Sequence, residues 1–181
     1  KKRSFISKII DKYFREAMFE RYKKTINFIT ENKVKSVLDV GCGSGVYMEI
    51  LSDKSVEVAG LDLSENMIEL SRERLSKKNL KYDNLIVGSY LETKINKQYE
   101  ASILMGFFDY IENPKLIFEK LVTDTSKYIL ASFPKKGGLL AFQRKIRYNL
   151  RQCPLYLYTK RDVQILAEKL TINDYKIIDN T

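Results

Sequence analysis

A short apolar run that ends in an acid and three alternating glycines constrains the fold of this chain more than any other feature. Residues 36–40 form the run, which contains Asp39. Glycines then occupy every second position, at Gly41, Gly43 and Gly45. Because glycine lacks a Cβ atom, this spacing permits a tight turn and lets a ligand approach the backbone. The pattern predicts a buried strand that turns directly into a helix, with a binding loop between them.

The same alternation of strand, turn and helix continues along the chain. Ser64 has the position of a helix N-cap, and Pro114 suits the first turn of a later helix. The alternation predicts an α/β fold, a doubly wound and mostly parallel Rossmann-like sheet with helices on both faces. The expected strands cover residues 36–40, 56–61, 85–87, 101–105 and 128–133, and the expected helices cover residues 46–51, 64–78 and 114–121.

A single domain is expected for the 181 residues, because no internal repeat or low-complexity linker divides them. Apolar side chains three and four positions apart predict a helical extension. Thr159 and Asp162 predict a cap at the start of the last helix. The four expected parts are a helical extension (1–33), a core (34–133), a basic insertion (134–160) and a closing helix and strand (161–181).

Composition excludes several kinds of chemistry. Histidine is absent, which removes a Ser-His-Asp triad, a His general base and any His-containing zinc site; no metal site is expected. Cys42 lies inside the glycine turn, where a structural disulfide with Cys153 is not expected. A reduced environment is therefore expected for this chain. No run of about 18 apolar residues and no apolar leader is present, so a cytoplasmic protein without a transmembrane segment is expected.

Positive charge is concentrated in one segment. The formal net charge is +9, and eight basic residues with no acidic ones lie between residues 135 and 161. Such a segment suits an anionic substrate, a solvated face, anionic membrane lipids or a nucleic acid, and these interpretations stay open. The residues are Lys135, Lys136, Arg144, Lys145, Arg147, Arg151, Lys160 and Arg161.

Asp62 ends the second expected strand, where its carboxylate can accept hydrogen bonds from both hydroxyls of a ribose. The dinucleotide fingerprint would require glycine at Val46, which disfavours NAD. No Gly-Lys-Ser/Thr follows the turn, which excludes a P-loop. A nucleotide-like ligand at the carboxyl ends of the strands is therefore expected.

The segment from Asp39 to Gly45 resembles the first motif, D/E-x-G-x-G-x-G, of the class I S-adenosylmethionine (SAM)-dependent methyltransferases. The resemblance covers residues 34–133 and implies SAM as cofactor, with S-adenosylhomocysteine (SAH) as product. It implies that Asp39 holds the ammonium group of SAM and that Asp62 binds the ribose. Ser89 stands where the family often has aspartate, so Ser89 and Tyr90 are the candidates for reading the adenine. The implied cofactor-binding residues are Asp39, Gly41, Cys42, Gly43, Gly45, Asp62, Leu63, Met67, Ser89, Tyr90, Met105 and Gly106.

The flanks look like a diverged relative of the magnesium-protoporphyrin O-methyltransferases. This resemblance rests on segments 13–14, 19–22, 132–134 and 156–158. The family sheet usually closes with a β-hairpin, but only three residues follow the strand expected at residues 175–178. The last strand of the sheet is therefore expected to be missing here.

The acceptor is expected to be a small and anionic molecule, with O-methylation as one option. The N/D-P-P-Y/F motif of base-amine methylation and the Pro-Cys nucleophile of cytosine methylation are both absent. A carboxylate acceptor arrives deprotonated and needs no base, whereas a hydroxyl would need Asp109 or Tyr110 to take its proton. The alternative is a nucleic-acid-associated SAM-binding protein or an RNA methyltransferase that uses the basic segment; the oligomeric state is left open.

A lid is expected over the acceptor. Residues 135–158 follow the fifth strand, with Gly137 and Gly138 as a hinge and residues 139–150 as a helix. Arg144 and Arg147 are three positions apart and would grip an anion together. The expected substrate-binding residues are Phe107, Phe108, Arg144, Arg147, Tyr156 and Tyr158.

Overall fold

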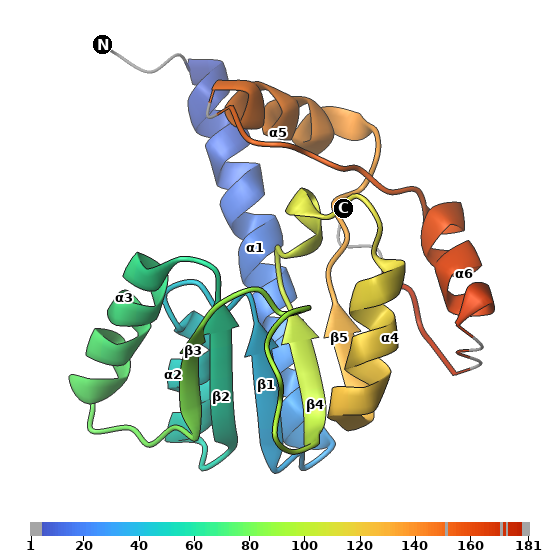
Figure 1. The fold of residues 1–181 in the computed structure, drawn as a ribbon. Coiled ribbons are helices and arrows are strands. Elements are labelled where there is room, and N and C mark those ends of the chain that lie inside the picture. Colours follow the sequence, from blue (N-terminus) through green and yellow to red (C-terminus); the bar gives the residue numbers. More distant parts are fainter. Residues whose placement is uncertain (1–4, 151, 171, 173, 179–181) are drawn as a thin grey trace.

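Five parallel strands form one sheet in the order β3-β2-β1-β4-β5 (Figure 1). The structure is a computed structural model that describes residues 5–150, 152–170, 172 and 174–178, with side chains described from residue 15 and not for residues 139 and 140. The strands are β1 (Ser36–Val40), β2 (Glu57–Asp62), β3 (Asn84–Val87), β4 (Tyr99–Leu104) and β5 (Thr125–Ala131). The expected α/β fold with a parallel sheet is confirmed.

The strand order reverses between β1 and β4. From β1 the chain moves outward through β2 to β3, then returns to the other side of β1 for β4 and β5. In such sheets the crevice beyond the carboxyl ends of the two central strands is the place where ligands bind. All but the first residue of β1 is buried, as expected for a central strand covered on both faces.

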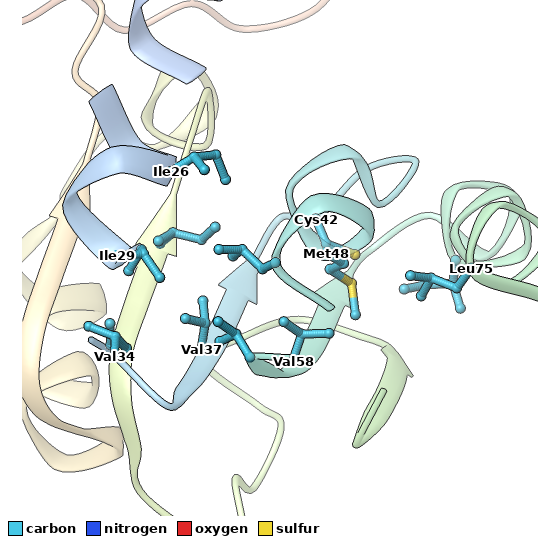
Figure 2. Packing of buried hydrophobic residues seen from close by; sticks show 13 residues of the cluster. Ile26, Ile29, Val34, Val37, Cys42, Met48, Val58 and Leu75 are labelled. Atoms are coloured by element: carbon cyan, nitrogen blue, oxygen red, sulfur yellow. The ribbon is translucent and has the colours of Figure 1, made fainter. Parts of the chain in front are cut away.

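Helices cover both faces of the sheet. Figure 2 shows one core cluster, in which Ile26 and Ile29 from α1 and Met48 from α2 pack near Val37 and Val58. A second cluster on the other face joins α4 and α6 to the sheet. The helices are α1 (Phe5–Glu31), α2 (Val46–Asp53), α3 (Glu65–Ser76), the 3-10 turn η1 (Phe108–Tyr110), α4 (Lys115–Asp124), α5 (Gly138–Leu150) and α6 (Lys160–Lys169).

Local signals set the helix boundaries. The Ser64 side chain accepts a hydrogen bond from the Met67 amide at the start of α3. Thr159 and Asp162 exchange side-chain and backbone hydrogen bonds at the start of α6, which forms a capping box. Pro114 is the N-cap of α4. These three predicted helix starts are confirmed.

The segment between β5 and α6 leaves the sheet and returns to it. The Lys136 amide donates to the Tyr158 carbonyl (2.8 Å), and the Tyr158 amide donates to the Pro134 carbonyl (2.9 Å). Between these points the chain forms α5, which lies across the end of α1 that extends beyond the sheet (Figure 1). Residues 134–158 are thus an excursion from the core.

The prediction of a closing strand at residues 175–178 is wrong. Residues 174–178 follow α6 without strand structure, and the sheet of the described residues ends at β5. No helix of the described part of the chain is long and apolar enough to cross a bilayer.

Candidate functional site

The glycine turn sits at the carboxyl end of β1. Gly41, Gly43 and Gly45 have φ angles of 74°, 54° and 72°, the left-handed region that glycine adopts without steric cost. The amides of Gly41 and Cys42 both donate to the Leu61 carbonyl, at 2.7 and 3.0 Å. The end of β2 therefore holds the turn in place.

The three glycines face different surroundings. A Cβ atom on Gly41 would lie 2.8 Å from Phe107 Cδ2, and one on Gly45 would lie 2.8 Å from Ser71 Oγ. A Cβ atom on Gly43 would meet nothing within 4 Å. Gly41 and Gly45 thus serve internal packing, whereas Gly43 presents bare backbone to open space.

Asp39 lies beneath this turn as a buried acid. Its side chain is 2% exposed, and its Oδ2 atom has no hydrogen-bond partner among the described residues. Burial, and secondly the nearby Asp62 carboxylate, raise the pKa of Asp39 to about 8. A buried carboxylate oxygen without a hydrogen-bond partner is costly, so ionised Asp39 needs a cation or a hydrogen-bond donor beside it.

Asp62 joins the turn to the start of α3. One carboxylate oxygen accepts from the Gly43 amide and the other from the Ser64 amide, both at 2.9 Å. The residue is only half-buried, so lone pairs on both oxygens remain reachable from the open side. Asp62 therefore shapes the loop and borders the open space next to Gly43.

Arg21 and Ser132 complete the site from distant parts of the chain, and neither was predicted as a site residue. Arg21 on α1 donates to Ser132 Oγ (3.3 Å), and Ser132 Oγ in turn accepts from the Gly106 amide (2.8 Å). The Nε atom of Arg21 is buried and has no partner in the described chain. The flanking motifs at residues 19–22 and 132–134 were the available signal, but they indicated no contact between the two.

Tyr47 is close enough to Arg21 and Asp39 for both to affect its pKa. Burial raises the pKa of its phenol, and the Arg21 guanidinium counteracts this, while Asp39 raises the pKa further. Thr25 on α1 donates to the Met105 sulfur (3.7 Å) at the end of β4. The site thus has a buried acid on one side and a partly buried guanidinium on the other, with a phenol within reach of both.

Two exposed apolar residues follow Asp62. Leu63 is 76% exposed and Met67 is 40% exposed, so both present apolar surface to solvent beside Asp62. Ser89, after β3, is half-buried. These three predicted residues border the same end of the sheet as Asp62.

Two predicted cofactor residues point into the core instead. The Tyr90 side chain is 3% exposed and its hydroxyl donates to buried Asp124 (2.8 Å), so it does not reach the ligand side. The Cys42 thiol packs near Met48 in the core cluster of Figure 2. Both Cys42 backbone groups are bonded within the turn and to β2. Neither side chain is placed to contact a ligand in this structure, so cofactor binding by Cys42 or Tyr90 stays a prediction that would involve the backbone.

Of the residues that follow β4, some lie beside the glycine turn and one lies in the core. Phe107 packs against Gly41 and is half-buried, while Gly106 lies near the Arg21 guanidinium. Phe108 is fully buried, with its ring stacked on Phe133 at a centroid distance of 4.5 Å. Phe108 is therefore a core residue rather than a substrate contact.

Asp109 and Tyr110 belong to a hydrogen-bonded cluster with α5. Asp109 is buried, and its Oδ2 accepts from the Tyr148 hydroxyl (2.6 Å). The same oxygen lies 3.8 Å from Arg144 Nε. The Tyr148 hydroxyl is also 3.2 Å from the Tyr110 hydroxyl, and Tyr110 is exposed. Asp109 thus anchors α5 and is not an open base, whereas Tyr110 remains accessible.

The anion clamp expected from Arg144 and Arg147 on α5 stays a prediction. Arg144 points inward to Asp109, and the half-buried Arg147 guanidinium lies 5.4 Å from the Tyr148 ring centroid. Tyr158 donates its hydroxyl to the Ile111 carbonyl, and Tyr156 is held through its amide by the Asp109 carbonyl (3.0 Å). Tyr158 therefore has a structural partner. Arg144 lies near Asp109, but its buried Nε atom makes no hydrogen bond within the described residues, so a substrate contact by Arg144, Arg147 or Tyr156 stays a prediction.

A family model described as a methyltransferase domain matches residues 37–123, which contain the glycine turn, Asp62 and β4. The matched segment, just under half of the chain, is similar to the class I SAM-dependent methyltransferases. This assignment agrees with the strand order and with the acid and glycines of the first motif.

Curated proteins similar to this chain are O-methyltransferases by name. It is 27% identical to malonyl-[acyl-carrier protein] O-methyltransferase 2 of Ilyobacter polytropus, over 95% of this chain and 66% of that protein. It is 28% identical to the ubiquinone biosynthesis O-methyltransferase of Azoarcus sp., over 60% of this chain and 43% of that protein. The chain thus spans less than two thirds of the length of these relatives.

Solved structures share the fold. The magnesium protoporphyrin IX methyltransferase of Synechocystis PCC 6803, with bound SAH, aligns over 93% of this chain and 78% of its own, with a TM-score of 0.71 and 16% identity. The plantazolicin methyltransferase with SAH aligns over 91% and 69%, with a TM-score of 0.66 and 22% identity. The resemblance to the magnesium-protoporphyrin enzymes therefore holds at the level of the fold.

Proposed function

We propose that this chain binds SAM at the glycine turn and transfers its methyl group to an oxygen of a small acceptor. The observation that carries the proposal is the unpartnered Oδ2 of buried Asp39, next to a glycine turn in which Gly43 has open space at its Cβ position. The names of the curated relatives support oxygen as the acceptor atom.

The charged groups fit the amino-acid end of SAM. The ammonium group supplies the cation that Asp39 lacks, and the Arg21 guanidinium suits the carboxylate. Tyr47 lies near both groups. Binding a zwitterion between an acid and a guanidinium compensates both charges, which a neutral ligand would leave buried and unpaired.

The remaining parts of SAM fit the neighbouring surface. The Asp62 carboxylate is positioned to accept from the ribose hydroxyls while it keeps its two backbone hydrogen bonds. Leu63 and Met67 offer exposed apolar surface to the adenine ring, and Ser89 is the polar group at that end. An adenine stacked there would cover the apolar surface that Leu63 now exposes.

The chemistry requires positioning more than covalent help. SAM supplies an activated methyl group, and an acceptor oxygen must attack it in line, so the rate depends on how the site orients the two. Asp109 is engaged by Tyr148 and Arg144 and is poorly placed to take a proton. A carboxylate acceptor is already ionised at neutral pH and needs no base. We therefore favour a carboxylate acceptor, with the accessible Tyr110 hydroxyl as a group that orients it.

The proposal is tested by calorimetry followed by an activity screen. We expect SAM and SAH to bind and NAD not to bind. Turnover, read as SAH formation, is then compared over matched carboxylate, phenol and amine acceptors, and the carboxylates should be methylated. Binding of NAD without SAM would overturn the cofactor assignment, and turnover of amines alone would overturn the acceptor assignment.

Gly43→Ala is expected to weaken SAM binding by about tenfold or more while the chain stays folded. The added methyl group meets no atom of the described residues within 4 Å and so enters the space assigned to the ligand. Its left-handed backbone costs about 1–2 kcal/mol of folding free energy. Calorimetry measures the affinity and thermal unfolding the stability.

Gly137→Ala is the matched control for this substitution. Gly137 also has a positive φ, of 94°, and open space at its Cβ position, but it lies outside the glycine turn. We expect a similar loss of stability and unchanged SAM affinity. Equal affinity losses in the two variants would show that backbone strain, not ligand contact, explains the effect at Gly43.

A further inference from the structure

We propose that α5 docks this protein onto an anionic membrane surface, through an outward row of three apolar side chains flanked by cations. The row consists of Phe142, Ile146 and Leu150, and we call it the apolar row. This inference concerns where the protein acts and does not depend on the proposed acceptor.

The inward face of α5 is defined by its contacts. Ala141 and Tyr148 are 3% and 5% exposed, and Arg144 points to Asp109. Residues of a helix are rotated by about 100° from one to the next. These three residues therefore share one face, which packs on the rest of the protein.

The apolar row lies on the opposite face. Phe142, Ile146 and Leu150 are four positions apart, so they form a continuous line along the helix. Their exposed fractions are 61%, 48% and 80%. A helix that packs on a protein core usually turns charged and polar residues outward. Here both faces carry apolar groups, and the outer one has no cover among the described residues.

Cations lie beside the apolar row. Lys145 is exposed on one flank of α5, and Lys135 and Lys136 are exposed just before the helix. No acidic residue occurs between positions 135 and 161. Apolar side chains between lysines are the pattern of a helix that lies in the lipid headgroup region, where anionic lipids attract the cations.

The charge distribution favours lipid over a second copy of the chain. A symmetric dimer would place the same basic segment of both copies face to face, with repulsion and no acidic partner. A single row of three side chains is also narrow for a protein interface of about 800 Å² per partner. The 13-residue α5 is too short to span a bilayer, so it would lie on the surface.

Co-sedimentation with vesicles tests the proposal on the whole chain. We expect binding to vesicles of phosphatidylcholine mixed with phosphatidylglycerol, little binding to phosphatidylcholine alone, and a decrease with added salt. The triple variant Phe142→Ser, Ile146→Ser, Leu150→Ser should bind the mixed vesicles more weakly, with an affinity reduced by about tenfold or more. Lys145→Glu should weaken binding by about fivefold or more.

The matched control replaces exposed apolar residues on another helix. Leu116 and Val122 on α4 are 55% and 53% exposed, so Leu116→Ser with Val122→Ser removes exposed apolar side chains away from α5. We expect this control to bind vesicles like the unchanged protein. Thermal unfolding should show all variants folded, because the replaced side chains point outward. The proposal would be overturned if the unchanged protein did not bind anionic vesicles, or if the triple variant bound them equally well. Binding of an acidic protein to the apolar row in place of lipid would also count against it.

A fluorescence measurement locates the contact independently. The chain has no tryptophan, so Leu150→Trp introduces a single reporter at the exposed end of the row. We expect its emission to shift to shorter wavelength on anionic vesicles, since the indole would leave water. A tryptophan that stays fully hydrated while the protein is vesicle-bound would show that another surface makes the contact.

Discussion

Asp39→Asn is expected to weaken SAM binding by about a hundredfold while it stabilises the ligand-free protein. The affinity falls because the amide keeps the shape of the side chain but removes the charge that the SAM ammonium group requires, a loss of about 3 kcal/mol. Stability rises because the carboxylate is buried, close to Asp62, and without a hydrogen-bond partner for Oδ2 within the described chain. Calorimetry and urea unfolding measure the two effects separately.

The stability effect has a defined pH dependence. The pKa of Asp39 rises from its ordinary 3.8 to about 8 in the folded protein. Between these values the folded state holds a proton that the unfolded chain has lost, so the free energy of unfolding decreases as the pH increases from about 4 to about 8. Asn does not titrate, so this contribution, on the order of a few kcal/mol, should vanish in the variant.

SAM affinity should show the opposite trend in the unchanged protein. The ammonium group favours the ionised acid, so binding expels the Asp39 proton and strengthens as the pH increases toward about 8. The Asp39→Asn variant should lack this dependence. A variant that binds SAM normally, or that is less stable without ligand, would show that Asp39 has a purely structural role.

Phe108→Ala is expected to lower the free energy of unfolding by about 3–5 kcal/mol. Phe108 is fully buried and packs against both Phe133 and Phe118, with centroid distances of 4.5 and 5.6 Å and nearly parallel rings. Removing the ring leaves a cavity at the base of the turn that follows β4, where rigid neighbours prevent collapse. Chemical denaturation measures the change.

Phe107→Ala is the neighbouring comparison. Phe107 is half-buried and its ring lies against Gly41, at the ligand side. We expect a smaller loss of stability than for Phe108→Ala and a larger change in methyl transfer relative to the folded fraction. An unchanged stability of Phe108→Ala, together with lost turnover, would restore Phe108 as a substrate contact.

The amino-acid sequence determined those features of this protein that depend on neighbouring residues. The glycine spacing fixed a tight turn after β1, and Ser64, Pro114 and the Thr159–Asp162 pair marked three helix starts. Each is a local effect of backbone conformation or of a hydrogen bond spanning three residues, so no tertiary information was needed. The alternation of elements likewise sufficed for a parallel α/β sheet.

Tertiary structure alone decided which side chains face the ligand. Arg21 meets Ser132 across 111 positions, a contact that exists only because α1 crosses the ends of β4 and β5. Phe107 and Phe108 are adjacent in sequence, but the 3-10 turn after β4 sends one to the glycine turn and the other into the core. Arg144 was predicted to face a substrate, and long-range packing places its Nε atom 3.8 Å from buried Asp109. The orientation of these side chains depends on burial and on charges that long-range packing brings together. Neither can be read from the residues next to each position in the sequence.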